Sequence, residues 1–168
     1  MKQSLGKTLS GIFGKSKKDR PEVATVPDSE LRFRLGIRSG DKVCLFHAPK
    51  YLLPLLLSGD LKLTLDWVES DSDVILYWLQ SQDDAADITI NLERMIKRGG
   101  RIWLIIPEGE AALRGGFTAS RDDVKRVVLE ATSLVDNKIL LLSNGECGIQ
   151  FMPRKAAREE ALMEDGTP

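Results

Sequence analysis

The chain has 168 residues, the length of one domain with a short arm at each end. Hydrophobic residues make up 42% of the chain and charged residues 29%, a composition typical of a globular protein and not of a disordered one. Because 24 Lys and Arg residues nearly balance 25 Asp and Glu residues, the charge excludes a strongly basic nucleic-acid binder that acts through bulk charge.

The first 27 residues form a basic arm and linker that we expect to be flexible. Residues 1–20 contain six basic residues and one acidic residue, whereas residues 21–153 contain 15 basic and 20 acidic residues. Four large apolar residues of the arm have the spacing of one helix face: Leu5, Leu9, Ile12 and Phe13. Such a cationic segment can bind an anionic membrane surface, although its three glycines weaken a helix. A flexible leader and an anchor over residues 1–18, for a membrane or a partner, are the two alternatives.

From residue 28 onward, apolar runs and helical spacings alternate along the chain. The runs predict strands at residues 42–46, 61–67, 73–79, 101–106, 138–142 and 148–152. The spacings predict helices at residues 28–35, 51–57, about 85–98 and 120–131, with a glycine-bearing loop at 108–118. Residues 81–84 are expected to cap the third helix, which Gly99 and Gly100 would end, and Ser120 is expected to cap the fourth.

This alternation predicts the fold class. Strands that alternate with helices form a parallel sheet with helices on both faces. The dipeptide Asn144-Gly145 is a hairpin signal, so the last two strands should be antiparallel. We therefore predict an α/β, three-layer, Rossmann-like domain over residues 28–153, whose mostly parallel sheet is closed by a C-terminal antiparallel hairpin. Residues 154–168 form a charged tail.

Three segments carry a resemblance to a known family. Residues 35–43 (LGIRSGDKV), 72–76 (SDVIL) and 95–104 (MIKRGGRIWL) resemble segments around the first, fourth and fifth strands of class I, S-adenosylmethionine-dependent methyltransferases. The similarity covers about residues 31–153. With residues 47–51 (HAPKY) after its first strand, the chain more closely resembles a bacterial family of uncharacterised proteins that look like shortened methyltransferase domains. This resemblance implies a methyltransferase-like fold and no particular activity.

The sequence departs from the methyltransferase pattern where the cofactor would bind. Methyltransferases follow their first strand with a Gly-x-Gly loop, whose backbone approaches the cofactor closely. Here residues 46–49 read Phe-His-Ala-Pro, and after this strand no glycine follows until Gly59. Residues 68–72 leave no room for a third strand and helix, and residues 80–82 (QSQ) replace the family's Asn-Pro-Pro-Tyr or Asp-Pro-Pro-Tyr motif. We therefore expect no cofactor; the alternative is S-adenosylmethionine, with its ribose bound by Asp66 or Glu69.

Candidate binding residues follow from the fold, because ligands of open α/β sheets bind beyond the carboxyl ends of the strands. The residues expected there, in chain order, are His47, Pro49, Lys50, Tyr51, Asp66, Glu69, Gln80, Ser81, Pro107 and Glu108. His47 could act as a general base or be a hydrogen-bonded loop histidine. Lys50 could bind an anion or be solvated, and Tyr51 could stack on a ligand or pack in the crevice. No nucleophile or metal is paired with His47 in the sequence, so no catalytic residue is predicted.

Metal and disulfide chemistry are not indicated. The two cysteines, Cys44 and Cys147, lie in separate apolar segments, and the one histidine is not at zinc-ligand spacing from either. Residues 69–73 alternate acidic side chains as calcium loops do, but they lack the later glycine and glutamate. We expect no metal site. No apolar run has the length of a signal peptide or a bilayer span, so we expect a cytoplasmic protein, peripheral to the membrane if the arm binds one.

Three functions are consistent with the sequence. The first is a non-catalytic binding or regulatory module, a pseudoenzyme that has lost the cofactor loop. The second is a divergent S-adenosylmethionine-dependent methyltransferase. The third is an adaptor held on a membrane or a partner by residues 1–18. The expected partner is a small molecule or a protein of unknown identity, with no specific nucleic acid. Exposed strand edges are compatible with a dimer, and the sequence leaves the oligomeric state open.

Overall fold

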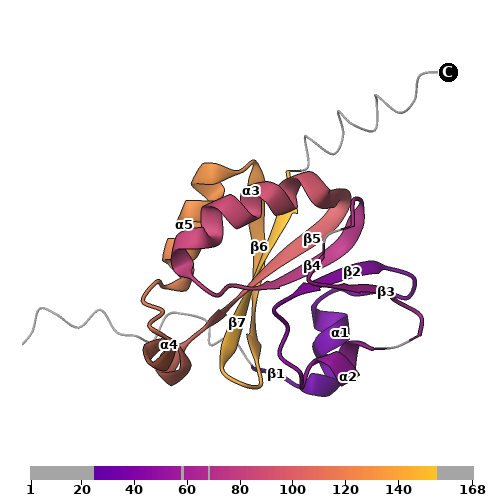
Figure 1. The fold of residues 1–168 in the computed structure, drawn as a ribbon, viewed down its shortest axis with the longest axis horizontal. Helices are drawn as coiled ribbons and strands as arrows, with labels where there is room; N and C mark the ends of the chain where they lie inside the picture. The colour runs from indigo at the N-terminus through magenta and orange to yellow at the C-terminus, as the bar shows by residue number, and fades with distance from the viewer. Residues whose placement is uncertain (1–24, 58, 68, 155–168) are drawn as a thin grey trace, which may run out of the picture.

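A computed structural model describes residues 25–57, 59–67 and 69–154 (Figure 1). Nearly all of the predicted basic arm, its anchor included, and nearly all of the charged tail lie outside the described residues. The described part of the predicted linker includes a short strand, β1 (Thr25–Val26), which pairs with β6 in the main sheet. The sheet therefore begins three residues before the boundary predicted at residue 28.

The centre of the domain is a seven-stranded sheet with the strand order β1-β6-β7-β5-β4-β2-β3. Its other strands are β2 (Lys42–Phe46), β3 (Lys62–Leu65), β4 (Ser72–Trp78), β5 (Ile96–Pro107), β6 (Leu134–Leu142) and β7 (Glu146–Pro153). Every neighbouring pair is parallel except those of β7, which is antiparallel to both β5 and β6. The predicted α/β class, the mostly parallel sheet and the antiparallel C-terminal hairpin are thereby confirmed.

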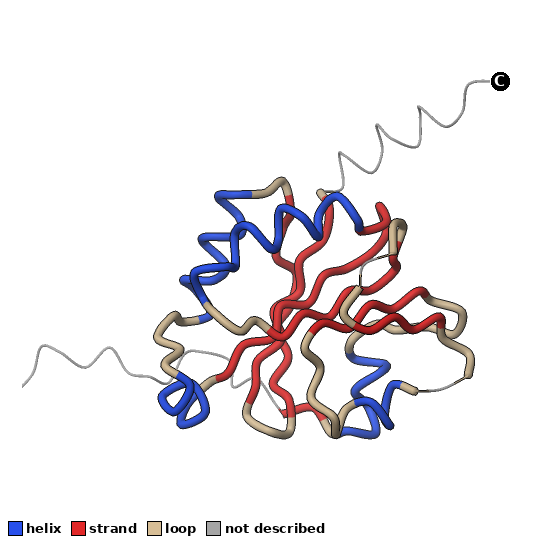
Figure 2. The backbone as a smooth tube through the Cα atoms, in the orientation of Figure 1, coloured by secondary structure: helices blue, strands red, loops and turns tan. Residues whose placement is uncertain are grey.

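Helices cover both faces of the sheet, as predicted from the alternation (Figures 1 and 2). On one face α3 (Ala85–Met95) packs beside α5 (Arg121–Ala131), and a short helix, α4 (Gly109–Gly115), precedes α5. On the other face lie α1 (Leu31–Arg34) and α2 (Leu53–Leu56). Two short 3-10 turns, η2 (Asp28–Glu30) and η3 (Gln82–Asp84), lead into α1 and α3.

Strand β5 contributes to two separate apolar cores, one on each face of the sheet. Trp103 and Ile105 belong to the core beneath α1 and α2, and Ile102 and Leu104 belong to the core beneath α3 and α5. The Trp103 indole N–H, fully buried, donates to the carbonyl of Leu35 at 3.0 Å. Burial on both faces explains why the central strands read as continuous apolar runs rather than as alternating ones.

The third helix ends earlier than the sequence predicts. It was expected to reach residue 98, with the two following glycines as its stop. Instead α3 ends at Met95, and Ile96 already pairs with Ser72 of β4. Lys97 then lies 3.5 Å from the Asp73 carboxylate rather than in the last turn of the helix. Strand pairing with β4 outweighs the helical spacing of the side chains, so Gly99 and Gly100 lie within β5.

Smaller differences concern short helices and strand ends. The region 108–118, predicted as a loop, contains α4, whose last residue is followed by the C-cap Gly116 with a left-handed φ of 70°. The helix predicted at residues 28–35 is present as η2 followed directly by α1. The helix predicted at 51–57 is reduced to the single turn of α2, and β6 begins four residues before the predicted strand. The predicted cap at Ser120 is confirmed: its hydroxyl accepts from the Asp123 N–H at 3.1 Å and the Asp123 carboxylate accepts from the Ser120 N–H at 2.9 Å.

The connection from β3 to β4 confirms the missing third-strand unit. The described residues between these strands form neither a helix nor a strand. Strand β3 is therefore at the edge of the described sheet. Among the described residues, no helix is long and apolar enough to cross a membrane.

The two adjacent glycines of β5 provide a test of this packing. A Cβ atom on Gly100 would lie 2.8 Å from the Ile96 side chain and 2.9 Å from the Asp73 carbonyl oxygen, whereas a Cβ on Gly99 meets nothing within 4 Å. We expect Gly100→Ala to lower the free energy of unfolding by about 1–3 kcal/mol, because the backbone of β4 must shift. The matched variant Gly99→Ala should leave it unchanged or slightly higher. Urea unfolding measures both, and equal effects would contradict the close approach of β4 and β5.

Candidate functional site

The candidate site lies where β2, β3, β4 and β5 end, because these four strands are parallel and finish at the same edge of the sheet. His47 directly follows β2, Asp66 directly follows β3, and Glu108 directly follows β5. Gln80 comes two residues after the end of β4. The structure thus places candidates from all four strand ends on one edge.

A hydrogen bond joins the ends of β2 and β3. The His47 N–H donates to Asp66 Oδ1 at 2.9 Å, and the Asp66 N–H donates to the Leu45 carbonyl at 2.8 Å. Both His47 and Asp66 have left-handed backbones, with φ of 55° and 53°, a conformation that costs energy outside glycine. The carboxylate at the end of β3 therefore fastens the loop that stands in place of the glycine-rich loop.

The His47 ring lies against Tyr77 of β4. The Tyr77 hydroxyl is 3.4 Å from His47 Nε2, and the two rings meet edge to face with 5.4 Å between centroids. The Phe46 ring also stacks on Tyr77, with 5.2 Å between the ring centroids. Burial, reinforced by the carboxylates of Asp84 and Asp66, raises the pKa of Tyr77. The phenol therefore stays protonated, and the tautomer of the His47 ring determines which of the two groups donates in their contact.

The rest of the loop turns toward β7. The Pro49 carbonyl accepts from the Leu52 N–H at 3.0 Å, which starts the turn into α2. Lys50 is exposed and forms no ion pair with a described residue. Tyr51 is 44% exposed. Partial burial and the carboxylates of Glu146 and Asp28 raise its pKa to about 12. Its hydroxyl is therefore neutral at physiological pH.

Glu69 is not brought to this edge. Its carboxylate lies 3.5 Å from Lys42 Nζ, and its carbonyl accepts from the Ser72 hydroxyl at 2.5 Å. Lys42 begins β2 and Ser72 begins β4, so Glu69 belongs to the opposite edge of the sheet. Of the two residues expected to bind a ribose, only Asp66 has the required position.

Two neighbouring pockets open along the candidate edge on the side of β5. One, of about 540 Å³, is lined by the end of β5, by α4 and by the start of α5, with Glu108, Phe117 and Arg121 among its residues. The other, of about 300 Å³, lies over the ends of β4 and β5 and includes Gln80 and Glu146. Their walls mix apolar and polar groups, as sites for small polar ligands do.

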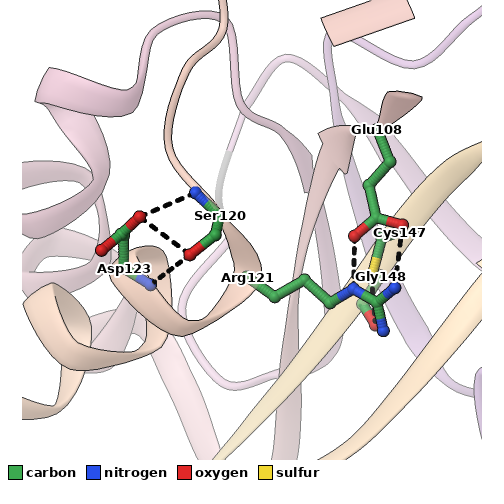
Figure 3. Close-up of polar contacts among 6 residues, drawn as sticks. All are labelled: Glu108, Ser120, Arg121, Asp123, Cys147 and Gly148. Carbon is green, nitrogen blue, oxygen red and sulfur yellow. Dashed lines mark hydrogen bonds and ion pairs between the residues drawn. The ribbon is translucent and has the colours of Figure 1, made fainter. Parts of the chain in front are cut away.

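An ion pair lies in the wall of the larger pocket (Figure 3). The Glu108 carboxylate receives two bonds from the Arg121 guanidinium, one of them at 3.1 Å from Nη2. This pairing raises the pKa of Arg121 further, so the guanidinium stays charged. Beneath the pair lies the buried Cys147 thiol, whose pKa is raised to about 12 by burial and by the Glu108 carboxylate. The thiol is therefore neutral and not a nucleophile.

Gln82 holds the loop between α4 and α5. Its amide oxygen accepts from the N–H groups of Thr118 and Ala119 at 2.8 and 2.7 Å, and its amide nitrogen donates to the Thr118 hydroxyl at 2.9 Å. Its neighbours have local roles: Gln80 donates to the Trp78 carbonyl at 3.0 Å, and Ser81 accepts from the Asp83 N–H at 3.3 Å. The predicted cap thus acts on η3, and Gln82 fixes one wall of the larger pocket.

Sequence reasoning missed several residues of the edge. Tyr77 lies within an apolar strand, and Gln82 directly follows Gln80 and Ser81, which were predicted as binding residues in its place. Arg121 and Glu146 begin α5 and β7, and no sequence pattern marked the start of either element as part of a binding site. Glu146 accepts from the Trp78 indole N–H at 2.9 Å, a contact that needs the antiparallel placement of β7 beside β5. Among the described residues, no group of three or more His, Cys, Asp or Glu side chains is arranged to hold a metal ion.

Comparison with solved structures identifies the architecture. A methyltransferase from Aquifex aeolicus described as S-adenosylmethionine-dependent superposes with a TM-score of 0.60 at 12% identity, over 76% of this chain and 89% of that one. The fold is that of class I methyltransferases. The N-methyltransferase NodS from Bradyrhizobium japonicum WM9 gives a TM-score of 0.53 at 14% identity, over 74% of this chain and 92% of that one.

A third superposition covers only half of a longer enzyme. The mitomycin 7-O-methyltransferase MmcR has a TM-score of 0.54 and 15% identity, and the superposition covers 69% of this chain and 50% of that one. No family model matches the sequence, and no curated protein sequence matches it significantly. The resemblance to methyltransferases is thus one of fold, and the comparisons lend no support to the expectation that no cofactor binds.

The residues of the site do not reproduce the way the family holds its cofactor. His47 adopts a left-handed backbone but brings a side chain where the family has a small residue, and Pro49 has no N–H to donate. The His47 N–H is already bonded to Asp66. Asp66 Oδ1 is engaged by the His47 N–H, whereas no described residue binds Asp66 Oδ2. One carboxylate oxygen is left for a cofactor ribose.

Removal of the Gln82 side chain should free the pocket loop. In Gln82→Ala the Thr118 and Ala119 N–H groups lose their acceptor, at a cost of about 1 kcal/mol. We expect faster hydrogen exchange at these two amides and unchanged exchange in β4. Gln80→Ala is the matched control, because Gln80 bonds to the Trp78 carbonyl and not to the loop. Equal exchange in the two variants would show that Gln82 does not hold the loop.

Both cysteines should be inert in the folded protein. Cys44 and Cys147 are buried, and the raised pKa of Cys147 keeps its thiol protonated. We expect no reaction with Ellman's reagent at about pH 8 in the native state and full reaction of both thiols after unfolding in guanidinium. Because the folded-state pKa lies above that of the unfolded thiol, stability should fall as pH rises between the two values. Rapid native-state labelling would contradict this burial.

Proposed function

We propose that this chain is a non-catalytic binding module built on the class I methyltransferase fold. The observation that supports it best is the hydrogen bond between His47 N–H and Asp66 Oδ1. In this bond the backbone N–H of His47, the first residue of the loop, donates to Asp66, the one candidate carboxylate that is placed to meet a ribose. The groups that would otherwise meet a ribose and the remainder of a cofactor are thereby engaged within the protein.

The ion pairs and hydrogen bonds along the edge are consistent with binding rather than turnover. A general base must reach the proton it removes, and it needs a positioned partner. The His47 ring is held by the Tyr77 hydroxyl and ring, and the Arg121 charge is neutralised by Glu108. What the edge offers a ligand is shape and hydrogen bonding in the two pockets beside β5. A small polar molecule is the class of ligand that such walls suit.

A divergent methyltransferase is the second candidate. It rests on the fold and on Asp66, whose second carboxylate oxygen is not bound by a described residue. In this reading Asp66 would accept from the ribose hydroxyls of S-adenosylmethionine, the sulfonium compound that supplies the methyl group. The His47 side chain would have to leave its contact with Tyr77 to make room for this cofactor.

Calorimetric titration separates the two. We expect S-adenosylmethionine and S-adenosylhomocysteine to give no saturable heat with the full chain and to leave its melting temperature unchanged. Asp66→Asn is the matched variant, because it keeps the shape of the side chain and an acceptor for the His47 N–H while removing the charge. Saturable binding that Asp66→Asn weakens would refute the proposal and favour the methyltransferase. In that case the methyl acceptor becomes the next question.

A further inference from the structure

The free edge of β3 combines an open strand with exposed apolar side chains. Strand β3 is hydrogen bonded to β2 on one side and ends the strand order on the other. Leu65, its last residue, is 51% exposed, and Trp67, two residues further along the chain, is 69% exposed. An edge that presents unpaired backbone groups together with apolar side chains is a template for another strand.

The pairing with β2 determines which backbone groups of β3 are free. The N–H groups of Lys62 and Asp66 donate toward β2, to the carbonyls of Asp41 and Leu45 at 3.0 and 2.8 Å. Because the direction of backbone groups alternates along a strand, Thr64 also faces β2, while Leu63 and Leu65 direct their N–H and carbonyl groups outward. A strand added to this edge must therefore hydrogen bond to Leu63 and Leu65.

A second copy of β3 meets this requirement in one favourable register. In an antiparallel pair related by a twofold axis perpendicular to the sheet, Leu63 of each copy faces Leu65 of the other, and both are outward-facing residues. The axis then passes between the two Thr64 residues, and Lys62 of each copy lies opposite Asp66 of the other, which directly follows the strand with a left-handed backbone. Of the two neighbouring allowed registers, one places Asp60 opposite Asp66, so that like charges meet. The other places Leu65 opposite Leu65 and Thr64 opposite Asp66, so the pairing of Lys62 with the Asp66 carboxylate is lost.

The side chains favour the first register as well. Lys62 is exposed and forms no ion pair with a described residue, so its ammonium is available to a partner. Leu63 already packs on the core beneath α1 and α2, and Leu65 continues that face. Pairing would bring each half-exposed Leu65 against Leu63 of the other copy. A lysine on an edge strand usually discourages pairing, but here it would meet a carboxylate.

We propose that two copies of this chain dimerise by antiparallel pairing of their β3 strands, with Leu63 opposite Leu65 and Lys62 opposite Asp66. The two seven-stranded sheets become one continuous sheet across the twofold axis. Apolar contact at the Leu63–Leu65 pairs and two ion pairs hold the interface, with no exchange of segments between the copies.

Sedimentation velocity of the full chain over a range of concentrations tests the dimer. We expect a reversible monomer–dimer equilibrium in which Lys62→Asp, which sets carboxylates against each other, raises the dissociation constant by about tenfold or more. Asp66→Lys should do the same. The double variant Lys62→Asp/Asp66→Lys should restore the dimer. The double variant and Asp66→Lys both lose the hydrogen bond between Asp66 and His47. Stronger dimerisation of the double variant than of Asp66→Lys can therefore come only from the restored charge pair.

Hydrogen exchange tests the register. Dimerisation should protect the Leu63 and Leu65 amides as concentration rises, while the Thr64 amide, already directed to β2, stays unchanged. Arg114→Asp on α4, which makes the same change of charge far from β3, is the control and should leave the equilibrium intact (Figure 1). A chain that is monomeric throughout would overturn the proposal. So would a dimer that neither single charge variant weakens.

Discussion

Burial of β5 on both of its faces is the constraint on which the rest of this domain depends. The strand lies between β4 and β7, and its side chains alternate between two cores. Each core needs a cover, so helices must lie on both sides of the sheet. The helix-covered parallel strands then all end at one edge. The candidate site therefore occupies a position fixed by packing and not by its own polar residues.

The polar groups at that edge are largely satisfied by one another. Asp66 binds the His47 N–H, Glu108 binds Arg121, and Glu146 binds the Trp78 indole. Each contact joins two different elements, so together they tie the strand ends, the loops and β7 into one frame. Such mutual satisfaction stabilises the edge, because a partly buried polar group without a partner costs free energy.

The sequence predicted the sheet better than the edge, for a physical reason. Apolar runs and turn dipeptides report burial and local geometry, which are properties of neighbouring residues along the chain. They identified the central strands and the hairpin at Asn144-Gly145, and the missing glycines identified the altered loop. The end of α3 was wrong because the pairing of Ile96 with Ser72 depends on a strand far away in the sequence. Contacts such as Gln82 with Thr118 depend on the assembled fold in the same way.

The placement of Glu69 illustrates the same limit within one loop. Glu69 and Asp66 are three residues apart, and the sequence offered both as carboxylates after the second strand. The chain reverses between them, so Asp66 stays beside His47 while Glu69 returns to Lys42 at the start of β2. The connection from β3 leads directly to the start of β4, because it contains no additional strand. The loss of that unit thus both separates the two carboxylates and exposes β3.

Asp66 connects the two inferences about this protein. One of its oxygens holds the His47 loop, and the other is free either for a ribose hydroxyl or for Lys62 of a second copy. These two uses compete, because both draw on the same carboxylate oxygen. A dimer of the proposed geometry would therefore disfavour the cofactor. By reciprocity of linked equilibria, a bound cofactor would disfavour the dimer to the same degree.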